Sequence, residues 1–292
     1  MRNLKANLLE LIRRTSAELP DDVFRAVDVG AKAEPAGTTG AYAMDIVTKN
    51  IDLAKRKSQP LCQDTGSILF FVKIPVGLDQ ITFGAAAKAA VGDATAKGYL
   101  RQNSVDSVTG KNSGNNLGPG SPTIHFHHYR GARLDVRLIL KGGGCENVGA
   151  QYSLPDARIG ANRDLDGVRK VILDAVVQAQ GKGCSPGILG VCIGGDRATG
   201  YLHSKEQLLR TLDDVNPDPP LAALEQDVVQ TGNKLGIGPM GFGGKTTLLG
   251  CKVGALNRLP ASFFVSISYM CWAYRRQGFV LDAQGKILKW LY

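Results

Sequence analysis

The chain has 292 residues, of which 43% are hydrophobic and 21% are charged. This balance is typical of a soluble globular protein with one large domain or two lobes, and no stretch approaches the ~20 apolar residues that span a bilayer. The net charge is +9, but basic residues form a run only at 55–57 and few aromatic residues accompany them, which argues against nucleic-acid binding. The positive excess favours an anionic small substrate or an acidic partner.

The N-terminal segment, residues 4–19, has apolar residues at helical spacing and is predicted to be an amphipathic helix that ends before Pro20. It lacks the apolar core and the small-residue cleavage site of a signal peptide, so we expect a cytoplasmic protein. Cysteines in such a chain favour metal binding or catalysis over a disulfide framework. The six cysteines are Cys62, Cys145, Cys184, Cys192, Cys251 and Cys271.

The predicted elements indicate an α/β fold of mixed α+β layers, with a helical N-terminal third followed by mixed β-sheets flanked by helices. A polar loop fills residues 102–122, and a loop of this length is usually functional or disordered. Helices are predicted at 4–19, 20–35, 41–57, 83–100, 166–183, 201–212 and 221–236. Strands are predicted at 67–76, 123–129, 132–144, 187–195 and 248–256, and again within 262–292 around a turn at 283–286.

A polar pentad, CQDTG at residues 62–66, stands directly before an apolar strand. A strand that only filled a core would have branched or aromatic residues there, so the pentad is predicted to have a function. Cys184 and Cys271 also lie at the ends of predicted elements, which suits thiolates that face a pocket. Cys192 and Cys251 lie inside apolar runs and are interpreted as core residues. The spacing of Cys62, Cys184 and Cys271 carries no local metal signature, so spacing alone favours structural cysteines.

Three other motifs leave alternatives open. The glycines of KGGGCEN, residues 141–147, allow backbone N–H groups to approach a ligand, but a flexible strand end fits equally well. The segment GPMGFGGKTT at 238–247 is not a P-loop, because Pro239 occupies the position of the required glycine. His125 and His127 share one face of a predicted strand without a visible third ligand, so we interpret them as structural.

Taken in order, several segments resemble the α-type catalytic region of the class I iron–sulfur hydro-lyases, the class I fumarases and L-tartrate dehydratases. The resemblance covers nearly the whole chain, and it implies the fold of the N-terminal domain of class I fumarases. Residues 1–292 would form one α-type catalytic domain. The segments are PLCQDTGSILFFVK, LRQNSVDSVTGKNSGN, KGGGCEN, LGIGPMGFGGKTT and CWAYRRQG.

In that family three cysteines hold a [4Fe-4S] cluster. The matched motifs imply Cys62, Cys184 and Cys271 as the ligands, with Cys145 a thiol near the site. Three thiolates rather than four leave one iron open to act as a Lewis acid on a substrate oxygen.

The resemblance also implies roles for other residues. Asp64 would be the acid/base carboxylate and would contact the substrate together with Gln63, Arg101 and the backbone of Gly144. Gly66 would let the chain turn tightly before the strand. Family members often carry a histidine twelve residues before the last cysteine, whereas this chain has Leu259 there.

The implied reaction is the reversible hydration and dehydration of a 2-hydroxy dicarboxylate. Fumarate and water to (S)-malate, a reaction of the tricarboxylic acid cycle, is preferred because GPMGFGGKTT is closer to the fumarase form. L(+)-tartrate to oxaloacetate is the alternative, since CWAYRRQG and CQDTGSILFFVK look more like the tartrate enzyme. A cluster-binding oxidation sensor without turnover is a third reading, which Asp64 and Arg101 disfavour.

A partner is implied as well. Single-chain class I fumarases continue with a second lobe that supplies further substrate-binding groups. We therefore expect a separate β-type subunit, in an α2β2 assembly, with no nucleic acid and no membrane among the partners.

Overall fold

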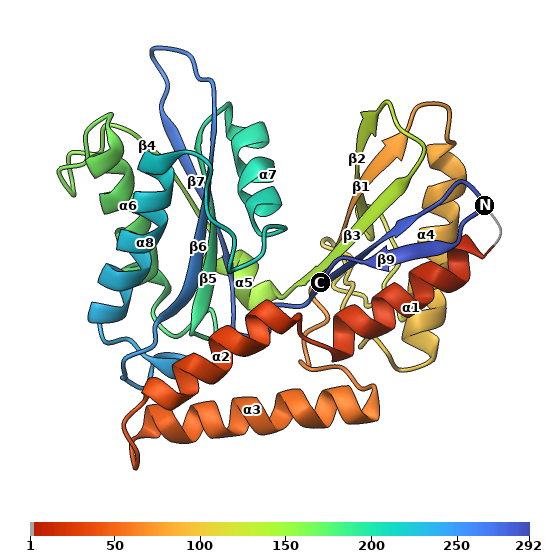
Figure 1. Cartoon of the computed structure of the whole chain (residues 1–292), viewed down its shortest axis with the longest axis horizontal. Coiled ribbons are helices and arrows are strands. Elements are labelled where there is room, and N and C mark those ends of the chain that lie inside the picture. Colours follow the sequence, from red (N-terminus) through yellow and green to blue (C-terminus); the bar gives the residue numbers. More distant parts are fainter. Residues whose placement is uncertain (1–2) are drawn as a thin grey trace. The chain divides into compact units, whose positions relative to one another are not determined.

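The computed structural model describes residues 3–292, and the chain divides into two compact units (Figure 1). The first unit comprises Met1–Asp21, Lys49–Gly143 and Ala273–Tyr292, and the second comprises Asp22–Thr48 and Gly144–Trp272. Each unit has its own hydrophobic core. None of the helices in the described part of the chain is long and apolar enough to cross a membrane.

The first unit is built on a mixed sheet with the strand order β2-β1-β3-β8-β9. β1 is an interior strand that pairs in parallel with β2 and antiparallel with β3, and its residues from Ile68 to Val72 are all buried. Burial on both faces explains the continuous apolar run in the sequence. The elements are α1 (Leu4–Ala17), β1 (Ser67–Pro75), α4 (Gln80–Ala96), β2 (Thr123–Tyr129), β3 (Leu134–Lys141), β8 (Arg276–Leu281), β9 (Ile287–Trp290) and the C-terminal part of α3 (Thr39–Lys57).

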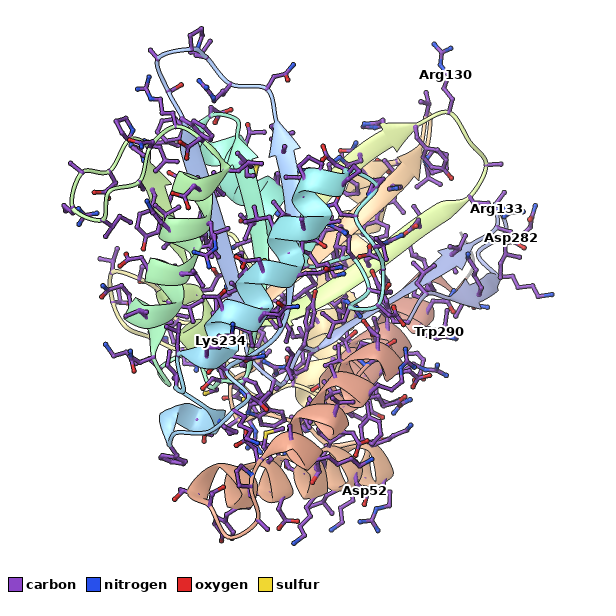
Figure 2. The ribbon with its side chains drawn as sticks, turned by 60° about the vertical axis from the view of Figure 1, so that its left-hand side comes forward. Asp52, Arg130, Arg133, Lys234, Asp282 and Trp290 are labelled. Atoms are coloured by element: carbon purple, nitrogen blue, oxygen red, sulfur yellow. The ribbon has the colours of Figure 1, made fainter. Side chains whose placement is uncertain are left out.

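The C-terminal hairpin of the first unit is fastened to α1. Trp290 of β9 packs edge-on against Phe279, and the Arg14 guanidinium lies 3.9 Å from the centre of the Trp290 ring. The predicted turn is present, since the backbone N–H of Asp282 donates to the carbonyl of Lys286. Figure 2 shows Trp290 and Asp282 in this region, and Arg130 of the β2–β3 loop extends outward from its ribbon.

The second unit is built on a sheet with the strand order β4-β7-β5-β6. In β5, Leu189 and Val191 belong to the core formed with α6 and α8, whereas a Cβ on Gly190 would meet the Ser204 carbonyl of α7. Alternate residues therefore serve opposite faces, and Figure 1 shows α6 and α8 on one side of the sheet and α7 on the other. The elements are α2 (Asp21–Ala33), α5 (Gly143–Asn147), β4 (Ala150–Ser153), α6 (Leu165–Ala179), β5 (Gly187–Gly194), α7 (Arg197–Gln207), α8 (Pro219–Lys234), the 3-10 helix η1 (Pro239–Gly241), β6 (Leu248–Leu256) and β7 (Phe264–Met270).

Aspartate side chains fix where several helices begin. Asp79 accepts backbone N–H groups at the start of α4, and Asp164, Asp196 and Asp218 do the same for α6, α7 and α8. These bonds satisfy donors that a helix N-terminus otherwise leaves unpaired.

The predicted mixed α/β fold is confirmed, and the strand at 248–256 has the predicted bounds. The helix predicted at 201–212 begins earlier, at Arg197, because Asp196 caps it there. Two short elements, α5 and β4, were not predicted. The glycine-rich segment after β3 begins a helix instead of continuing as a flexible strand end.

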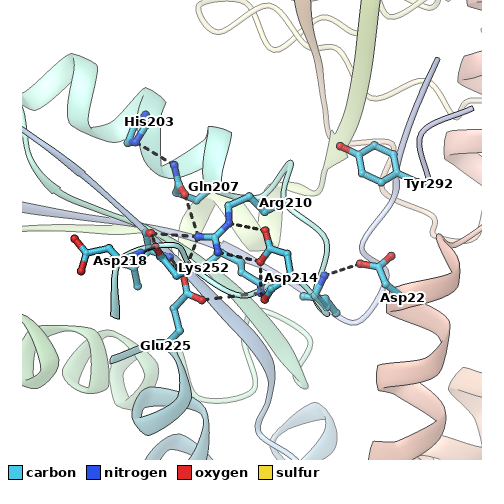
Figure 3. A network of polar contacts seen from close by, with 12 residues as sticks. Asp22, His203, Gln207, Arg210, Asp214, Asp218, Glu225, Lys252 and Tyr292 are labelled. Carbon is cyan, nitrogen blue, oxygen red and sulfur yellow. Dashed lines mark hydrogen bonds and ion pairs between the residues drawn. The ribbon is translucent and has the colours of Figure 1, made fainter. Parts of the chain in front are cut away.

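A partly buried ion network links the segment after α7 to α8 and β6 in the second unit (Figure 3). The Arg210 guanidinium makes two hydrogen bonds to Asp214, at 2.8 and 2.9 Å, and one of 2.8 Å to Glu225. Lys252 donates to Asp214 at 2.6 Å. Burial raises the pKa of Asp214, but the bonds from Arg210 and Lys252 outweigh it and leave that pKa lowered. The stabilisation from Asp214 is therefore present above its usual pKa and is lost as the pH falls.

We expect Glu225→Ala to lower the free energy of unfolding by about 3–5 kcal/mol, because it leaves Arg210 and Lys252 buried with one carboxylate fewer. Asp213→Ala is the control: its ion pair with Arg25 is 61% exposed on both sides and should contribute less than about 1 kcal/mol. Urea unfolding of both variants measures the difference. Equal losses would show that burial does not control the strength of these ion pairs.

Candidate active site

The polar pentad forms a bonded turn before β1. The Thr65 hydroxyl accepts the backbone N–H of Arg101 and donates to the carbonyl of the same residue, both at 2.9 Å. The backbone N–H of Asp64 donates to Cys62 Sγ at 3.4 Å. The turn is thereby tied to the start of the polar loop, and the Cys62 sulfur already receives one backbone donor.

The Asp64 carboxylate joins three of the segments that the sequence singled out. Its Oδ2 accepts the backbone N–H of Gly143 at 2.6 Å, and its Oδ1 accepts the side-chain amide of Asn103 at 3.0 Å. Gly143 is the first residue of α5. The carboxylate thus holds the CQDTG, LRQNS and KGGG segments together, and both of its oxygens receive a hydrogen bond.

Two glycines permit this close approach. Gly66 has φ +75°, and a Cβ there would stand 2.2 Å from the Lys141 carbonyl oxygen. A Cβ on Gly142 would stand 3.1 Å from Asp64 Oδ2. The predicted tight turn at Gly66 is confirmed, and the reason is twofold: a backbone conformation that favours glycine and direct contact with another strand end.

Asp64 also borders a pocket of about 270 Å³ within the first unit. Polar and apolar atoms share its walls, and four of the lining residues carry a hydroxyl group. The lining residues are Asp64, Gly66, Ser67, Ile68, Asn103, Ser104, Asn116, Gly120, Ser121, Thr123 and Gly143. Such walls can hold water or a small hydroxylated molecule against the carboxylate.

The other predicted substrate-binding residues are placed differently. Gln63 and Arg101 are exposed. The Arg101 backbone is bonded beside Asp64 as described, and its guanidinium makes no hydrogen bond or ion pair within residues 3–292. Gly144 is the second residue of α5 and belongs to the second unit, where a Cβ on it would lie 3.5 Å from the Lys182 carbonyl oxygen. The first unit therefore brings Asp64 and the backbone of Arg101 together.

The three predicted ligand cysteines lie at element ends, as expected. Cys62 belongs to the first unit and precedes β1, whereas Cys184 and Cys271 belong to the second. Cys184 precedes β5 and has φ +56°, a left-handed conformation that is uncommon outside glycine. Cys271 directly follows β7, and the backbone N–H of Trp272 donates to the Cys184 carbonyl at 3.5 Å. These two cysteines are therefore neighbours along their backbones.

Tyr269 reports on the thiols of the second unit. Its pKa is raised, first by burial and then by the electrostatic influence of Cys271, Cys145 and Cys184. Cys145, predicted to be a thiol near the site, thus lies in the same surroundings as two predicted ligands. Thiolates with backbone N–H donors suit an iron–sulfur cluster, so the donor chemistry fits. Among the described residues, no group of three His, Cys, Asp or Glu side chains has the arrangement of a metal site.

Cys192 and Cys251 are core residues, as predicted. They lie in β5 and β6 and are 0% and 3% exposed. Burial, with the Glu206 charge, raises the pKa of Cys192 to about 12, and burial also raises the pKa of Cys251. Neither thiol is poised to ionise near neutral pH.

The glycine-rich loop at 238–247 is held by residues that sequence reasoning missed. The Glu34 carboxylate accepts the backbone N–H groups of Lys245 and Thr246 at 2.7–3.0 Å. Ser185, next to Cys184, donates its hydroxyl to the Gly238 carbonyl and accepts the Met240 N–H with its own carbonyl. The loop is therefore bonded to the segment that carries Cys184, which only tertiary structure could reveal.

The histidine pair and Leu259 lie outside these contacts. His125 stacks on Phe71 with 5.0 Å between ring centres, consistent with a structural role. Leu259, at the position where family members often have histidine, is 74% exposed in the segment between β6 and β7.

Comparison with known proteins decides the family. The model described as fumarate hydratase (Fumerase) matches residues 5–280. The chain belongs to this family. It is 54% identical over its whole length to a putative class I fumarate hydratase of Geobacillus stearothermophilus, and the match spans 58% of that protein.

Relatives named as tartrate dehydratases are more distant but of similar length. The putative L(+)-tartrate dehydratase subunit alpha of Methanocaldococcus jannaschii is 31% identical over 92% of this chain and 94% of its own length. The L(+)-tartrate dehydratase subunit alpha of Escherichia coli K12 is 29% identical over 92% of this chain and 87% of its own length. The predicted resemblance is confirmed, and the chain is a member of a hydro-lyase family.

We expect Gly66→Ala to destabilise the first unit more than Gly77→Ala. Both glycines have positive φ, +75° and +89°, so alanine costs each about 1–2 kcal/mol of backbone energy. A Cβ on Gly77 meets nothing within 4 Å, whereas at Gly66 it overlaps the Lys141 carbonyl and should cost a further ~1–3 kcal/mol. Thermal unfolding of the two variants measures this difference, and equal melting temperatures would contradict the close approach.

Proposed function

We propose that the chain is the cluster-binding subunit of a [4Fe-4S] hydro-lyase that hydrates and dehydrates a 2-hydroxy dicarboxylate. The preferred reaction is fumarate and water to (S)-malate. The observation that carries this preference is the 54% identity, over the whole chain, to a relative named as a class I fumarate hydratase. The name belongs to a protein of which this chain spans little more than half, so activity and substrate are part of the proposal.

A second candidate is the dehydration of L(+)-tartrate to oxaloacetate. The chain covers 94% of one tartrate dehydratase alpha subunit and 87% of another. Those relatives are named as subunits, and we therefore propose that this chain also acts with a β-type subunit, in an α2β2 assembly in the cytoplasm. The net charge of +9 would assist encounters with an acidic partner and with a dianionic substrate.

The proposed cluster ligands are Cys62, Cys184 and Cys271. When bound, a cluster with three thiolate ligands supplies one iron with an open coordination position that can act as a Lewis acid on the substrate hydroxyl. The Asp64 N–H bond to Cys62 Sγ supports this assignment, because such donors stabilise negative charge on sulfur.

The proposed acid/base residue is Asp64. Hydrogen bonds from the Asn103 amide and the Gly143 N–H hold the carboxylate in one orientation beside the pocket. In this role Asp64 would give a proton to the departing hydroxyl and recover it on hydration. Gln63, Arg101 and the backbone of Gly144 would contact the substrate.

We expect that serine at Cys62, Cys184 or Cys271 removes the broad visible absorbance of the anaerobically reconstituted protein, because serine oxygen replaces thiolate poorly as an iron ligand. Cys192→Ala and Cys251→Ala are matched controls that should retain the absorbance. A normal spectrum and iron content in any of the three serine variants would remove that cysteine from the ligand set.

The function is tested by anaerobic assay of the reconstituted chain with its β-type partner, on fumarate, (S)-malate and L(+)-tartrate. Turnover of fumarate and malate is expected, and Asp64→Asn should keep the cluster but lower kcat by about 10²–10⁴-fold, since the amide cannot transfer a proton. Turnover of tartrate alone would select the second candidate. An intact cluster without turnover of any substrate would refute the enzyme proposal and favour the oxidation sensor.

A further inference from the structure

Arg275 is a buried arginine with two side-chain nitrogens, Nε and Nη1, that have no hydrogen-bond partner within residues 3–292. It directly precedes β8, and its backbone carbonyl accepts the N–H of Leu140 at the end of β3. The residue is 1% exposed. Arginine does not deprotonate in proteins, so a full positive charge is buried here with at least two N–H groups unsatisfied.

Burying a charged group without an acceptor costs free energy, and folded proteins almost always pair such a group with an acceptor. The adjacent Arg276 shows the contrast. It is also fully buried and its Nε likewise has no hydrogen-bond partner within residues 3–292, but its guanidinium lies 4.8 Å from the centre of the Tyr274 ring and 4.2 Å from that of Tyr292. No comparable ring contact is recorded for Arg275 in the described part of the chain. Arg275 therefore calls for an acceptor that the chain itself does not provide.

The position of the Arg275 guanidinium indicates where such an acceptor would lie. The point where a Cβ on Gly142 would stand is 3.8 Å from Arg275 Nη2 and 3.1 Å from Asp64 Oδ2. Arg275 is thus beside the proposed acid/base residue. The Asp64 oxygens already receive bonds from Gly143 and Asn103, so the donors of Arg275 are left for a third group.

A second unpaired cation belongs to the same unit. The Arg101 backbone is hydrogen-bonded to Thr65, next to Asp64, and its exposed guanidinium makes no hydrogen bond, ion pair or ring contact within residues 3–292. The Asp64 carboxylate thus has two arginines on adjoining segments, Arg101 and Arg275, and forms a hydrogen bond with neither guanidinium. Two guanidinium groups without an acceptor among the described residues match a ligand with two negative groups.

We propose that Arg275 is a substrate-binding residue that takes one carboxylate of the dicarboxylate, while Arg101 takes the other. This inference rests on the proposed function, since it names how the substrate of that site is recognised. A guanidinium held out of water binds a carboxylate through strong charge-assisted hydrogen bonds. Arg275 would then select dicarboxylates over monocarboxylates, because removing either carboxylate of the ligand leaves one arginine without its acceptor.

The test compares two inhibitors, succinate with two carboxylates and propionate with one, on the reconstituted chain with its partner. Arg275→Gln should weaken succinate binding by about 10- to 100-fold, the loss expected for a hydrogen bond to a charged group, and should raise KM more than it lowers kcat. Propionate binding should change far less, so the preference for succinate collapses. Arg275→Lys keeps the charge without the planar fork and should fall between Gln and the wild type.

Arg130→Gln is the matched control, because it makes the same change in net charge at an exposed residue of the β2–β3 loop (Figure 2). It should leave the preference for succinate unchanged. Calorimetric titration with succinate separates this inference from the proposed function, since it needs no turnover: succinate binding that depends on Arg275 in a protein without hydro-lyase activity would refute the function and retain the anion site.

Two outcomes would overturn the proposal. If Arg275→Gln lowers the melting temperature but retains the wild-type ratio of propionate to succinate inhibition constants, Arg275 is structural. If the variant loses the visible absorbance of the cluster while succinate still binds the remaining protein normally, the unused donors serve the cofactor instead of the substrate. Wild-type values in every measurement would likewise exclude a role in recognition.

Discussion

The hydrogen bond from the Gly143 backbone to the Asp64 carboxylate is the contact on which the arrangement of the first unit's candidate site depends. It joins the turn before β1 to the end of β3, at the point where Gly66 and Gly142 allow the two backbones to touch. The same carboxylate holds Asn103 and so fixes the start of the polar loop. Asp64, the residue proposed to transfer a proton, therefore also holds three segments of the first unit together. A substitution of Asp64 would change these contacts as well as the proposed proton transfer.

Much of this fold could be predicted from the sequence, because apolar periodicity and flanking polar residues mark most of the helices and strands. The bounds of β6 and the turn after β8 follow from such local signals. The short α5 could not be predicted, since it begins where the Asp64 side chain meets the N–H of Gly143, and that meeting is a product of tertiary structure.

The residues of the candidate site were likewise predicted only in part from the sequence. The sequence motif identified Cys62 and Asp64 because it concentrates unusual residue types in a few positions. Glu34, Ser185 and Arg275 were missed, although each makes or lacks contacts that bear on the site. Ser185 follows Cys184 and Arg275 lies within CWAYRRQG, but the sequence does not show their burial or which donors and acceptors find a partner in the fold. Only the inventory of donors and acceptors in three dimensions reveals them.

The two units differ in how their buried cations are paired. In the second unit Arg210 and Lys252 are neutralised by Asp214 and Glu225, so that network is complete within the protein. In the first unit Arg275 is 1% exposed, and its Nε and Nη1 have no hydrogen-bond partner within residues 3–292. A buried cation without an acceptor needs an explanation, and a carboxylate of a bound ligand would supply the missing acceptor.

The polar loop that follows Arg101 is closed at its base by one residue. Asn116, 2% exposed, accepts the N–H groups of Asn103 and Ser104 and donates to the Arg101 carbonyl, whereas Val108 at the far end of the loop is 94% exposed. The hydrogen bonds of Asn116 thus fix the loop geometry beside Asp64 at the base of the loop. A change at the tip of the loop should leave that geometry unaltered. Lengthening a loop costs little entropy. A peptide tag or a fluorescent label can therefore be inserted near Val108 while the hydrogen bonds of Asn116 stay intact.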